Sequence, residues 1–417
     1  MSEEGKKKHK ISLYWRILIV AGVILAAVTV LAMLWPAACD AYTDYVFPYI
    51  TIPMGWLVNL APFAVGEILM YAGAVLVIGA VVLSLIYGVK AIVRRIRKTG
   101  KTGVTGETAK TAETGEAATK TAKAGNYGFY KGYLKVLLGI VVAVLWLFLF
   151  QWWIPYHGYV MGEKNHTETV TLESLRKARE EIAKGLNKAM TEVERSADGR
   201  IVYPTREERD AAVEAALRKL SDTYPRLRGY YARPKEAFCS DVLDWMNIGG
   251  YTYPYTTEVT YNRYVDNLYW YSLVIHETAH RKGFYKENEA CFMAFLACLC
   301  SDDPLVRYSG LYDVWWDIDS AYWDTLLMSC GGDETKAAEI YFAEVQVDEA
   351  QMLLDMQDAA KQAQELYEQD DHPLEQYQEV ASDAADIGWD IQAQLIEGVS
   401  YSDVVKLIAE YYGDDAK

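Results

Sequence analysis

Three long apolar runs near the start of the chain constrain its fold more than any other feature. They are Ile17–Trp35, Ile68–Val89 and Val136–Ile154, and none of them contains a charged residue. Roughly 20 apolar residues are enough for a helix to cross a bilayer. A single run of this kind could be a buried core helix, but three within the first 154 residues favour transmembrane helices. The sequence therefore predicts a protein that has the lipid bilayer as a partner.

The placement of Lys and Arg predicts how these helices are oriented. Basic residues cluster before the first run, and the segment KAIVRRIRKTGK, Lys90–Lys101, follows the second. The segment between them, Pro36–Glu67, has no Lys or Arg. Because positive loops stay in the cytoplasm, we expect a cytoplasmic N-terminus and a multi-pass protein of the cell membrane. Everything after the third run then lies outside the cytoplasm. The first run is too long for the apolar part of a cleaved signal peptide, so we interpret it as an anchor.

Composition divides the chain into four parts. We expect two transmembrane helices with a short external loop in residues 1–98 and a disordered cytoplasmic linker in residues 99–130. The linker consists almost only of small, polar and charged residues, which cannot bury enough surface to fold. Residues 131–154 form the third transmembrane helix, and residues 155–417 an extracytoplasmic domain. Its last part is acidic, with 22 Asp and Glu against four Lys after Cys330, which is typical of a solvated helical surface.

Local patterns in the external part predict a mainly α (α+β) fold. Apolar residues recur every three or four positions from Leu172 to Val193, as on one face of a helix. A second helix is expected after Thr205, which forms a capping box with Glu208. The Tyr- and Thr-rich segment Tyr231–Arg263 is instead typical of short strands. We therefore expect a mostly helical domain with a small β-sheet.

The pentapeptide HETAH is the strongest chemical signal in the chain. Asn267 or Asp266 can cap a helix that runs through it, and Gly283 follows the expected end of that helix. On a helix, His276 and His280 are one turn apart and face the same way, so they can bind one zinc ion. Glu277 would then lie beside a zinc-bound water and act as the general base. Because HExxH is short and can occur by chance, its surroundings decide the interpretation.

A zinc site of this kind needs a third protein ligand. Two acids, Glu287 and Glu289, follow on a second expected helix that starts near Lys286. Glu287 shares a face with small residues that would let the two helices approach closely, and we favour it. Glu289 remains the alternative. Either acid could instead be a solvated residue in the first turn of a helix, where negative charge is favourable.

Several segments together resemble a known family. They are RPKEAFCSDVLDWMNIGGYTYPYTTEVTYN, HETAHRKGFYKENEACFMAFLAC, RYSGLYDV and, more weakly, GVSYSDVVKLIAEYY. With the three apolar runs, they are similar to a largely uncharacterised family of bacterial three-span membrane proteins. That family is predicted to carry an extracytoplasmic HExxH (gluzincin-like) zinc metallopeptidase domain. The resemblance implies a zincin-like fold, with His276, His280 and Glu287 as zinc ligands and Glu277 as the base. It departs at Cys291, where related peptidases have Asp or Asn.

The resemblance also implies where a peptide substrate would bind. Gluzincins hold the substrate by backbone pairing with an edge strand before the HExxH helix, and YTYPYTTEVTYN is its counterpart here. The corresponding candidates for substrate binding are Tyr253, Tyr255, Thr256, Thr257 and Glu258. A structural hairpin is the alternative for the same segment. Electrophiles for the tetrahedral intermediate are suggested by position alone, and these candidates are Arg307, Tyr308 and Tyr312.

We therefore expect a membrane-anchored zinc metallopeptidase that hydrolyses peptide bonds in peptide or protein substrates. The alternative is a catalytically inactive, peptidase-like membrane protein that binds or senses a ligand; Cys291 and the acidic tail favour it. No basic stripe with interleaved aromatic residues occurs outside the cytoplasmic face, so nucleic acid is not an expected partner.

Overall fold

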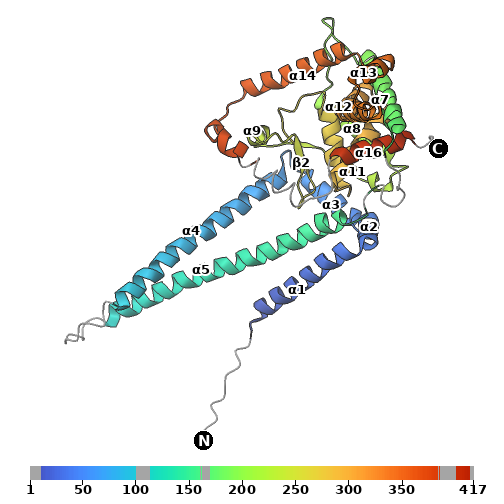
Figure 1. The fold of residues 1–417 in the computed structure, drawn as a ribbon. Coiled ribbons are helices and arrows are strands. Elements are labelled where there is room, and N and C mark those ends of the chain that lie inside the picture. Colours follow the sequence, from blue (N-terminus) through green and yellow to red (C-terminus); the bar gives the residue numbers. More distant parts are fainter. Residues whose placement is uncertain are drawn as a thin grey trace. The chain divides into compact units, whose positions relative to one another are not determined.

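The computed structural model describes residues 11–99, 113–159, 161, 170–383, 385 and 401–413. These residues are mainly helical with one small sheet (Figure 1), which confirms the predicted balance of helix and strand. The chain divides into two compact units. One consists of Met1–Val30 and Gly66–Leu149, and the other of Leu31–Val65 and Phe150–Lys417.

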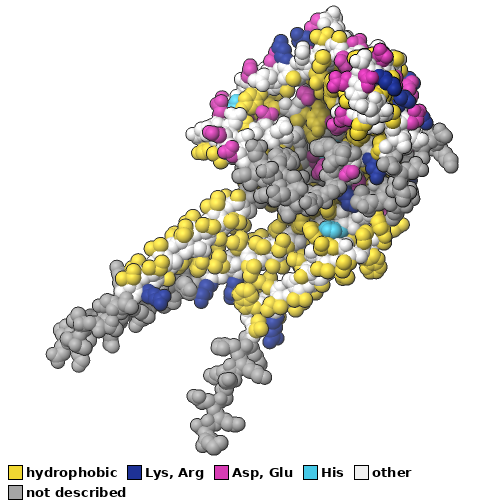
Figure 2. All heavy atoms as spheres, viewed as in Figure 1, with side chains coloured by type: hydrophobic (Ala, Val, Ile, Leu, Met, Phe, Trp, Pro, Cys, Tyr) yellow, Lys and Arg dark blue, Asp and Glu magenta, His cyan; other side chains and the backbone are white. Residues whose placement is uncertain are grey.

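Three helices supply the apolar segments that were predicted to cross a membrane. They are α1 (Leu13–Leu34), α4 (Val65–Thr99) and α5 (Glu113–Phe148), and the last is extended by the π-helical turn η1 (Leu149–Trp153) and by α6 (Ile154–Tyr156). The segments long and apolar enough to span a bilayer are Leu13–Leu34, Val65–Val93 and Gly128–Tyr156. Hydrophobic side chains cover most of their described surface in Figure 2, as lipid-facing helices require.

The predicted linker, residues 99–130, is described only in part. Residues 100–112 lie outside the described residues. From Glu113 onward the structure has helical backbone, as the start of α5, where the sequence had predicted disorder. The Ala, Glu and Lys content of this stretch favours helix, although it has little apolar surface to bury.

The second unit contains most of the remaining helices. Both helices predicted at its start are confirmed. The first is α7 (Leu172–Glu192); the second is α8 (Arg206–Leu220), in which Thr205 and Glu208 make both hydrogen bonds of a capping box. The other elements are α9 (Ser240–Trp245), α10 (Trp270–Arg281), α11 (Glu287–Cys300), α12 (Pro304–Ser329), α13 (Glu334–Ala343), α14 (Glu349–Gln369) and α16 (Tyr401–Gly413).

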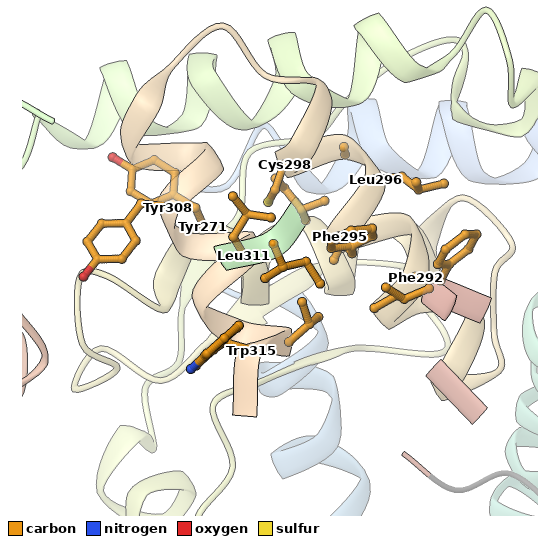
Figure 3. Packing of buried hydrophobic residues seen from close by; sticks show 14 of the residues in the cluster. Tyr271, Phe292, Phe295, Leu296, Cys298, Tyr308, Leu311 and Trp315 are labelled. Atoms are coloured by element: carbon orange, nitrogen blue, oxygen red, sulfur yellow. The ribbon is translucent and has the colours of Figure 1, made fainter. Parts of the chain in front are cut away.

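The core of this unit lies where α7, α10, α11 and α12 pack together (Figure 3). Tyr308 and Trp315 of α12 are fully buried there. At one point the backbones of α11 and α12 come very close, because Gly310 lies against Cys298. A Cβ atom added at Gly310 would stand 2.2 Å from the Cβ of Cys298. Glycine is therefore required at this crossing.

The small sheet has three strands in the order β1–β3–β2. β1 (Lys235–Glu236) runs parallel to the central strand β3 (Val259–Tyr261), and β2 (Gly250–Thr252) runs antiparallel to it. Within the described ranges, no strand pairs with the outer edge of β2. The Tyr-rich segment thus forms strands, as predicted, and β2 is an edge strand that packs on α10.

The second unit also contains the segment between the first two apolar helices. This segment forms α2 (Pro36–Tyr45) and α3 (Pro48–Val58). The guanidinium of Arg226 binds both acids of α2, Asp40 at 3.0 Å and Asp44 at 2.5 Å. The sequence had placed residues 36–67 in a short external loop apart from the domain at 155–417. Ion pairs between residues almost 190 positions apart leave no periodic pattern, so the sequence did not reveal this docking.

Candidate metal centre

The helix that carries HETAH begins and ends at the expected signals. The carboxylate of Asp266 accepts hydrogen bonds from the amides of Leu268 and Tyr269, at 3.0 and 2.8 Å, just before α10. At the other end Gly283 has φ of +95°, which turns the chain, and the amide of Phe284 bonds back to the carbonyl of Ala279. Of the two predicted caps, Asp266 therefore caps the turn that precedes α10, whereas the N-cap residue of the helix itself, Tyr269, makes no side-chain capping bond. The chain then turns directly into α11, whose first residue is Glu287.

Both histidines and Glu287 converge on one point. The Oε2 atom of Glu287 lies 3.2 Å from Nε2 of His276 and 3.5 Å from Nε2 of His280. Among the described residues, these three form a group whose ligand atoms all lie within 4.8 Å of one another. The Glu287 side chain is 51% exposed and those of His276 and His280 are 16% and 5% exposed. The group is therefore buried on the histidine side and open on the glutamate side.

The other nitrogen of each imidazole has its own partner. Nδ1 of His280 lies 2.8 Å from the carbonyl oxygen of Phe284, so this nitrogen carries the proton and donates it. Nδ1 of His276 lies 3.4 Å from Sγ of Cys291. Because Cys291 and Glu287 contact opposite nitrogens of the His276 ring, the thiol lies outside the triad. Both Nε2 atoms are thereby left to face Glu287, in the arrangement that a metal requires.

The distances suit zinc. Zinc–nitrogen and zinc–oxygen bonds of roughly 2.0–2.2 Å place neighbouring ligand atoms of a tetrahedral site about 3.3–3.6 Å apart. Of the two separations from Glu287, 3.5 Å lies within that range and 3.2 Å just below it. Two imidazoles and one carboxylate are also a ligand set used in catalytic zinc sites. The donor types and the two separations from Glu287 are therefore compatible with zinc.

Mutual interactions shift the pKa values of the triad. Burial opposes ionisation of Glu287, but hydrogen bonds from both histidines outweigh it and hold its pKa well below the usual range. Burial also opposes protonation of His276, but Cys291, Glu287 and Glu277 together raise its pKa well above its ordinary value. Both shifts have a common cause, because the negative charge of Glu287 and a positive charge on His276 stabilise each other.

Glu277 lies beside the triad and is tied to the edge strand. The hydroxyl of Thr252 lies 2.6 Å from the Glu277 carbonyl oxygen and 2.9 Å from its Oε2. Burial raises the pKa of Glu277, although the nearby His280 and His276 act against this. A Cβ atom at Gly250 would stand 3.0 Å from the carbonyl oxygen of Thr260, so the tight contact that favours glycine here is with β3, whereas its 3.5 Å distance from the Glu277 side chain would be an ordinary contact. A buried carboxylate with a raised pKa is suited to accept and return protons.

The comparisons with known proteins give a family. Residues 42–408 match a family model described as "Protein of unknown function (DUF3810)". This chain belongs to the DUF3810 family. Neither the curated proteins nor the solved structures gave a match. The matched range of the DUF3810 chain includes α3, the edge strand, Glu277 and all three members of the triad, and the family's description assigns them no activity.

In this DUF3810 chain, Glu289 points away from the triad. Its Oε1 accepts a hydrogen bond of 2.7 Å from the amide of Met161. Burial raises its pKa, against the pull of Lys286 and the Met161 amide. Glu289 thus anchors the chain that follows the third apolar helix, and Glu287 is the acid that lies next to both histidines.

The residues proposed to bind substrate lie mostly in the turn between β2 and β3. Tyr253 and Tyr255 are partly exposed, whereas Thr256, Thr257 and Glu258 are buried. Glu258 accepts hydrogen bonds from Lys235 at 2.7 Å and from the Thr256 hydroxyl at 2.8 Å. The last three residues are therefore part of an internal polar network. The edge strand itself begins earlier than the predicted residues, at Gly250.

The three predicted electrophiles have partners elsewhere. Arg307 binds Glu192 at 2.5 Å and the carbonyl of Ser301 at 2.8 Å. The Tyr308 hydroxyl donates to Asp355 at 3.1 Å, deep in the core. Tyr312 packs edge-on against Tyr308, with ring centroids 6.5 Å apart. The structure does not bring these side chains to the triad.

Sequence reasoning missed three contributors to the centre. The Trp152 ring lies 6.2 Å from that of His280 and 4.5 Å from that of Tyr285, so the end of the third apolar helix covers one side of the histidines. In the sequence, an aromatic residue at the end of an apolar run is typical of a membrane interface and does not indicate a contact with the histidines. The Phe284 carbonyl gives no sequence signal at all. Thr252 lay within the predicted strand segment but was not assigned to Glu277.

Proposed function

We propose that this chain is a membrane-anchored, zinc-dependent metallopeptidase whose site faces outside the cytoplasm. The observation that carries the proposal is the convergence of Nε2 of His276, Nε2 of His280 and Oε2 of Glu287, with the buried Glu277 beside them. When bound, zinc polarises a substrate carbonyl and acidifies a water molecule. Glu277 is placed to accept a proton from an attacking water and to pass it to the leaving amine. Thr252 holds the Glu277 carboxylate in place for both transfers.

The geometry of the edge strand β2 favours a peptide as the substrate. The amide of Tyr253 bonds to the carbonyl of Glu258, and the amide of Asn262 bonds to the carbonyl of Gly249. In an antiparallel pair, inward-bonding residues alternate with outward-facing ones. Gly249, Tyr251 and Tyr253 therefore bond toward β3, and the backbone groups of Gly250 and Thr252 face the outer edge. An extended peptide that paired with these groups would lie along the strand that holds Glu277.

The second candidate is a peptidase-like protein that binds zinc and a ligand without turnover. It is favoured by the partners of Arg307, Tyr308 and Tyr312, because none of these side chains reaches the triad to stabilise an oxyanion. The presence of Cys291 beside His276, instead of a stronger hydrogen-bond acceptor, also favours it. Both candidates require the same metal site and differ only in the role of Glu277.

The test uses the full chain in detergent micelles or nanodiscs. Zinc content is measured by atomic emission, and cleavage of a quenched fluorescent peptide library is compared between the wild type and Glu277→Gln. Active peptidases should lose at least about 100-fold in rate, since general-base catalysis contributes roughly 10²–10⁴-fold. Zinc without Glu277-dependent cleavage would establish the binding protein instead. Failure of the wild type to hold zinc at neutral pH would refute both.

A matched pair of variants tests the third ligand. Glu287→Gln removes the carboxylate next to both histidines and should abolish stoichiometric zinc. Glu289→Gln changes an acid of the same helical turn that bonds to Met161, and it should retain zinc. The opposite pattern would make Glu289 the ligand and would contradict the assignment made here.

A further inference from the structure

The outward face of α3 is apolar throughout. Tyr49, Trp56, Leu57 and Leu60 are 81%, 60%, 64% and 82% exposed, and their spacing places them on one side of the helix and its C-terminal extension. No Asp, Glu, Lys, Arg or His occurs between Asp44 and Glu67. A helix face that met water would normally carry charged or polar side chains. This face therefore needs an apolar partner.

The opposite face of α3 is fixed to the domain by buried cations. Lys235 donates to the carbonyls of Val58 and Phe63, at 2.7 and 2.8 Å, and to Glu258. Arg281 donates to the carbonyl of Thr51 at 3.4 Å, and its guanidinium lies over Gly55. Lys235 and Arg281 are almost completely buried. If α3 left the domain, these two cations would lose the carbonyl groups that they bind, which would be unfavourable.

Chain continuity places α3 next to the ends of two candidate spans. The helix follows the end of α1 at Leu34 and precedes the start of α4 at Val65, and all of Leu31–Val65 belongs to the same compact unit. The amide of Val65 bonds to Glu258, the partner of Lys235, at 3.0 Å. The Val65 end of the segment is therefore fixed at the start of an apolar helix, and a bilayer entered by that helix would be the apolar partner of the exposed face.

We propose that Tyr49, Trp56, Leu57 and Leu60 form a lipid-contact surface that lies in the interfacial region of the bilayer. Tyr and Trp are enriched at this depth because one end of each ring is apolar and the other is polar. Arg281, whose side chain packs on α3, directly follows His280 in the sequence. The lipid surface and the metal triad thus belong to one compact unit, so contact of this surface with lipid would hold the triad close to the bilayer.

The proposal is tested with the full chain in nanodiscs made from brominated phosphatidylcholine, which quenches nearby tryptophans. Subtracting the emission of Trp56→Phe from that of the wild type isolates the contribution of Trp56. Most of that contribution should be lost with bromine at carbons 6 and 7, less with bromine at carbons 11 and 12, and little with aqueous acrylamide. Trp316→Phe is the matched control, since Trp316 is 44% exposed on α12 and should respond to acrylamide only.

A second variant guards against a local effect of the substitution. In Trp56→Phe/Leu57→Trp the reporter moves by one position on the same face, and the bromine-sensitive emission should return. Emission from position 56 that acrylamide quenches and bromine does not would overturn the proposal. Protection from both quenchers would also overturn it, because the face would then be covered by protein. Neither result would bear on zinc or peptidase activity, so this test is independent of the proposed function.

Discussion

The crossing of α11 and α12 at Gly310 allows a quantitative test of the packing that positions Glu287. In Gly310→Ala the new Cβ would stand 2.2 Å from Cβ of Cys298 and 2.7 Å from its Sγ. Carbon atoms in contact are normally roughly 3.5–4.0 Å apart, so the helices must separate by about 1.5 Å. Neither of the two Cβ atoms can move away by a side-chain rotation, because the position of a Cβ is fixed by its own backbone.

The expected cost follows from two opposing terms. Overpacking of a well-packed core costs up to ~3 kcal/mol, while replacing a helical glycine by alanine contributes up to ~1 kcal/mol in the other direction. The net loss in the free energy of unfolding is about 2 kcal/mol, which lowers Tm by roughly 4–8 °C for a domain of this size. Thermal unfolding followed by tryptophan fluorescence in nanodiscs measures it. Zinc content should fall as well, because α11 carries Glu287.

Two backgrounds separate this mechanism from a general intolerance of substitution. Cys298→Ala removes Sγ but keeps the Cβ, so Gly310→Ala should remain destabilising there. Cys298→Gly removes the Cβ, and in that background Gly310→Ala should become stabilising by roughly 0.5–1 kcal/mol. If Gly310→Ala has the same effect in both backgrounds, or none in the wild type, the close approach of the two helices is not what limits residue 310.

Three further predictions concern the charges around the centre. Because the pKa of His276 is raised, zinc must displace its proton, and affinity should fall about tenfold per pH unit as the pH drops below that pKa; isothermal titration from pH 8 to 5 measures this, and a flat profile would exclude His276 as a ligand. Lys235→Met leaves the buried carboxylate of Glu258 without its cation and should cost ~3–5 kcal/mol in thermal unfolding, whereas Lys235→Met/Glu258→Gln should recover part of the loss; equal stability of the single and double variants would contradict the pairing. Cys291→Asp gives Nδ1 of His276 a carboxylate acceptor and should raise zinc affinity roughly 10-fold in competition with a chelator, while a marked fall would indicate that the thiol itself binds the metal.

The parts of the site that follow from chain-local spacing were predictable from the sequence. The turn between His276 and His280, the restart of helix at Lys286 and the chain reversal at Gly283 are all properties of a few adjacent residues. They place Glu287 opposite the histidines with little help from the rest of the fold. The capping box at Thr205 was predictable for the same reason.

Contacts between distant segments were not predictable in this way. The docking of α3 through Lys235 depends on carbonyl groups, which every residue has and which therefore leave no mark in the sequence. The Phe284 carbonyl at His280 is a further case. Trp152 did give a signal, but an aromatic residue at the end of an apolar helix has the same pattern whether it faces lipid or a histidine. The electrophile candidates were chosen only by their position after α11 in the sequence. One of them, Tyr308, is buried in the hydrophobic core.

The net charge of the triad and its neighbours affects the affinity of the centre for a metal ion. With neutral imidazoles, the carboxylates of Glu287 and Glu277 carry two negative charges, which one Zn²⁺ ion would neutralise. The Nδ1 partners of the two histidines are a carbonyl oxygen and the sulfur of Cys291, in place of two carboxylates. Carboxylates in both places would leave a net charge of about −2 in a mostly buried centre, at a substantial desolvation cost. Partners other than carboxylates reduce that cost but make the imidazoles weaker ligands. We therefore expect the affinity for zinc to rise with pH and the bound zinc to exchange readily. The rate at which a chelator removes zinc from the protein, measured at two pH values, would show both effects.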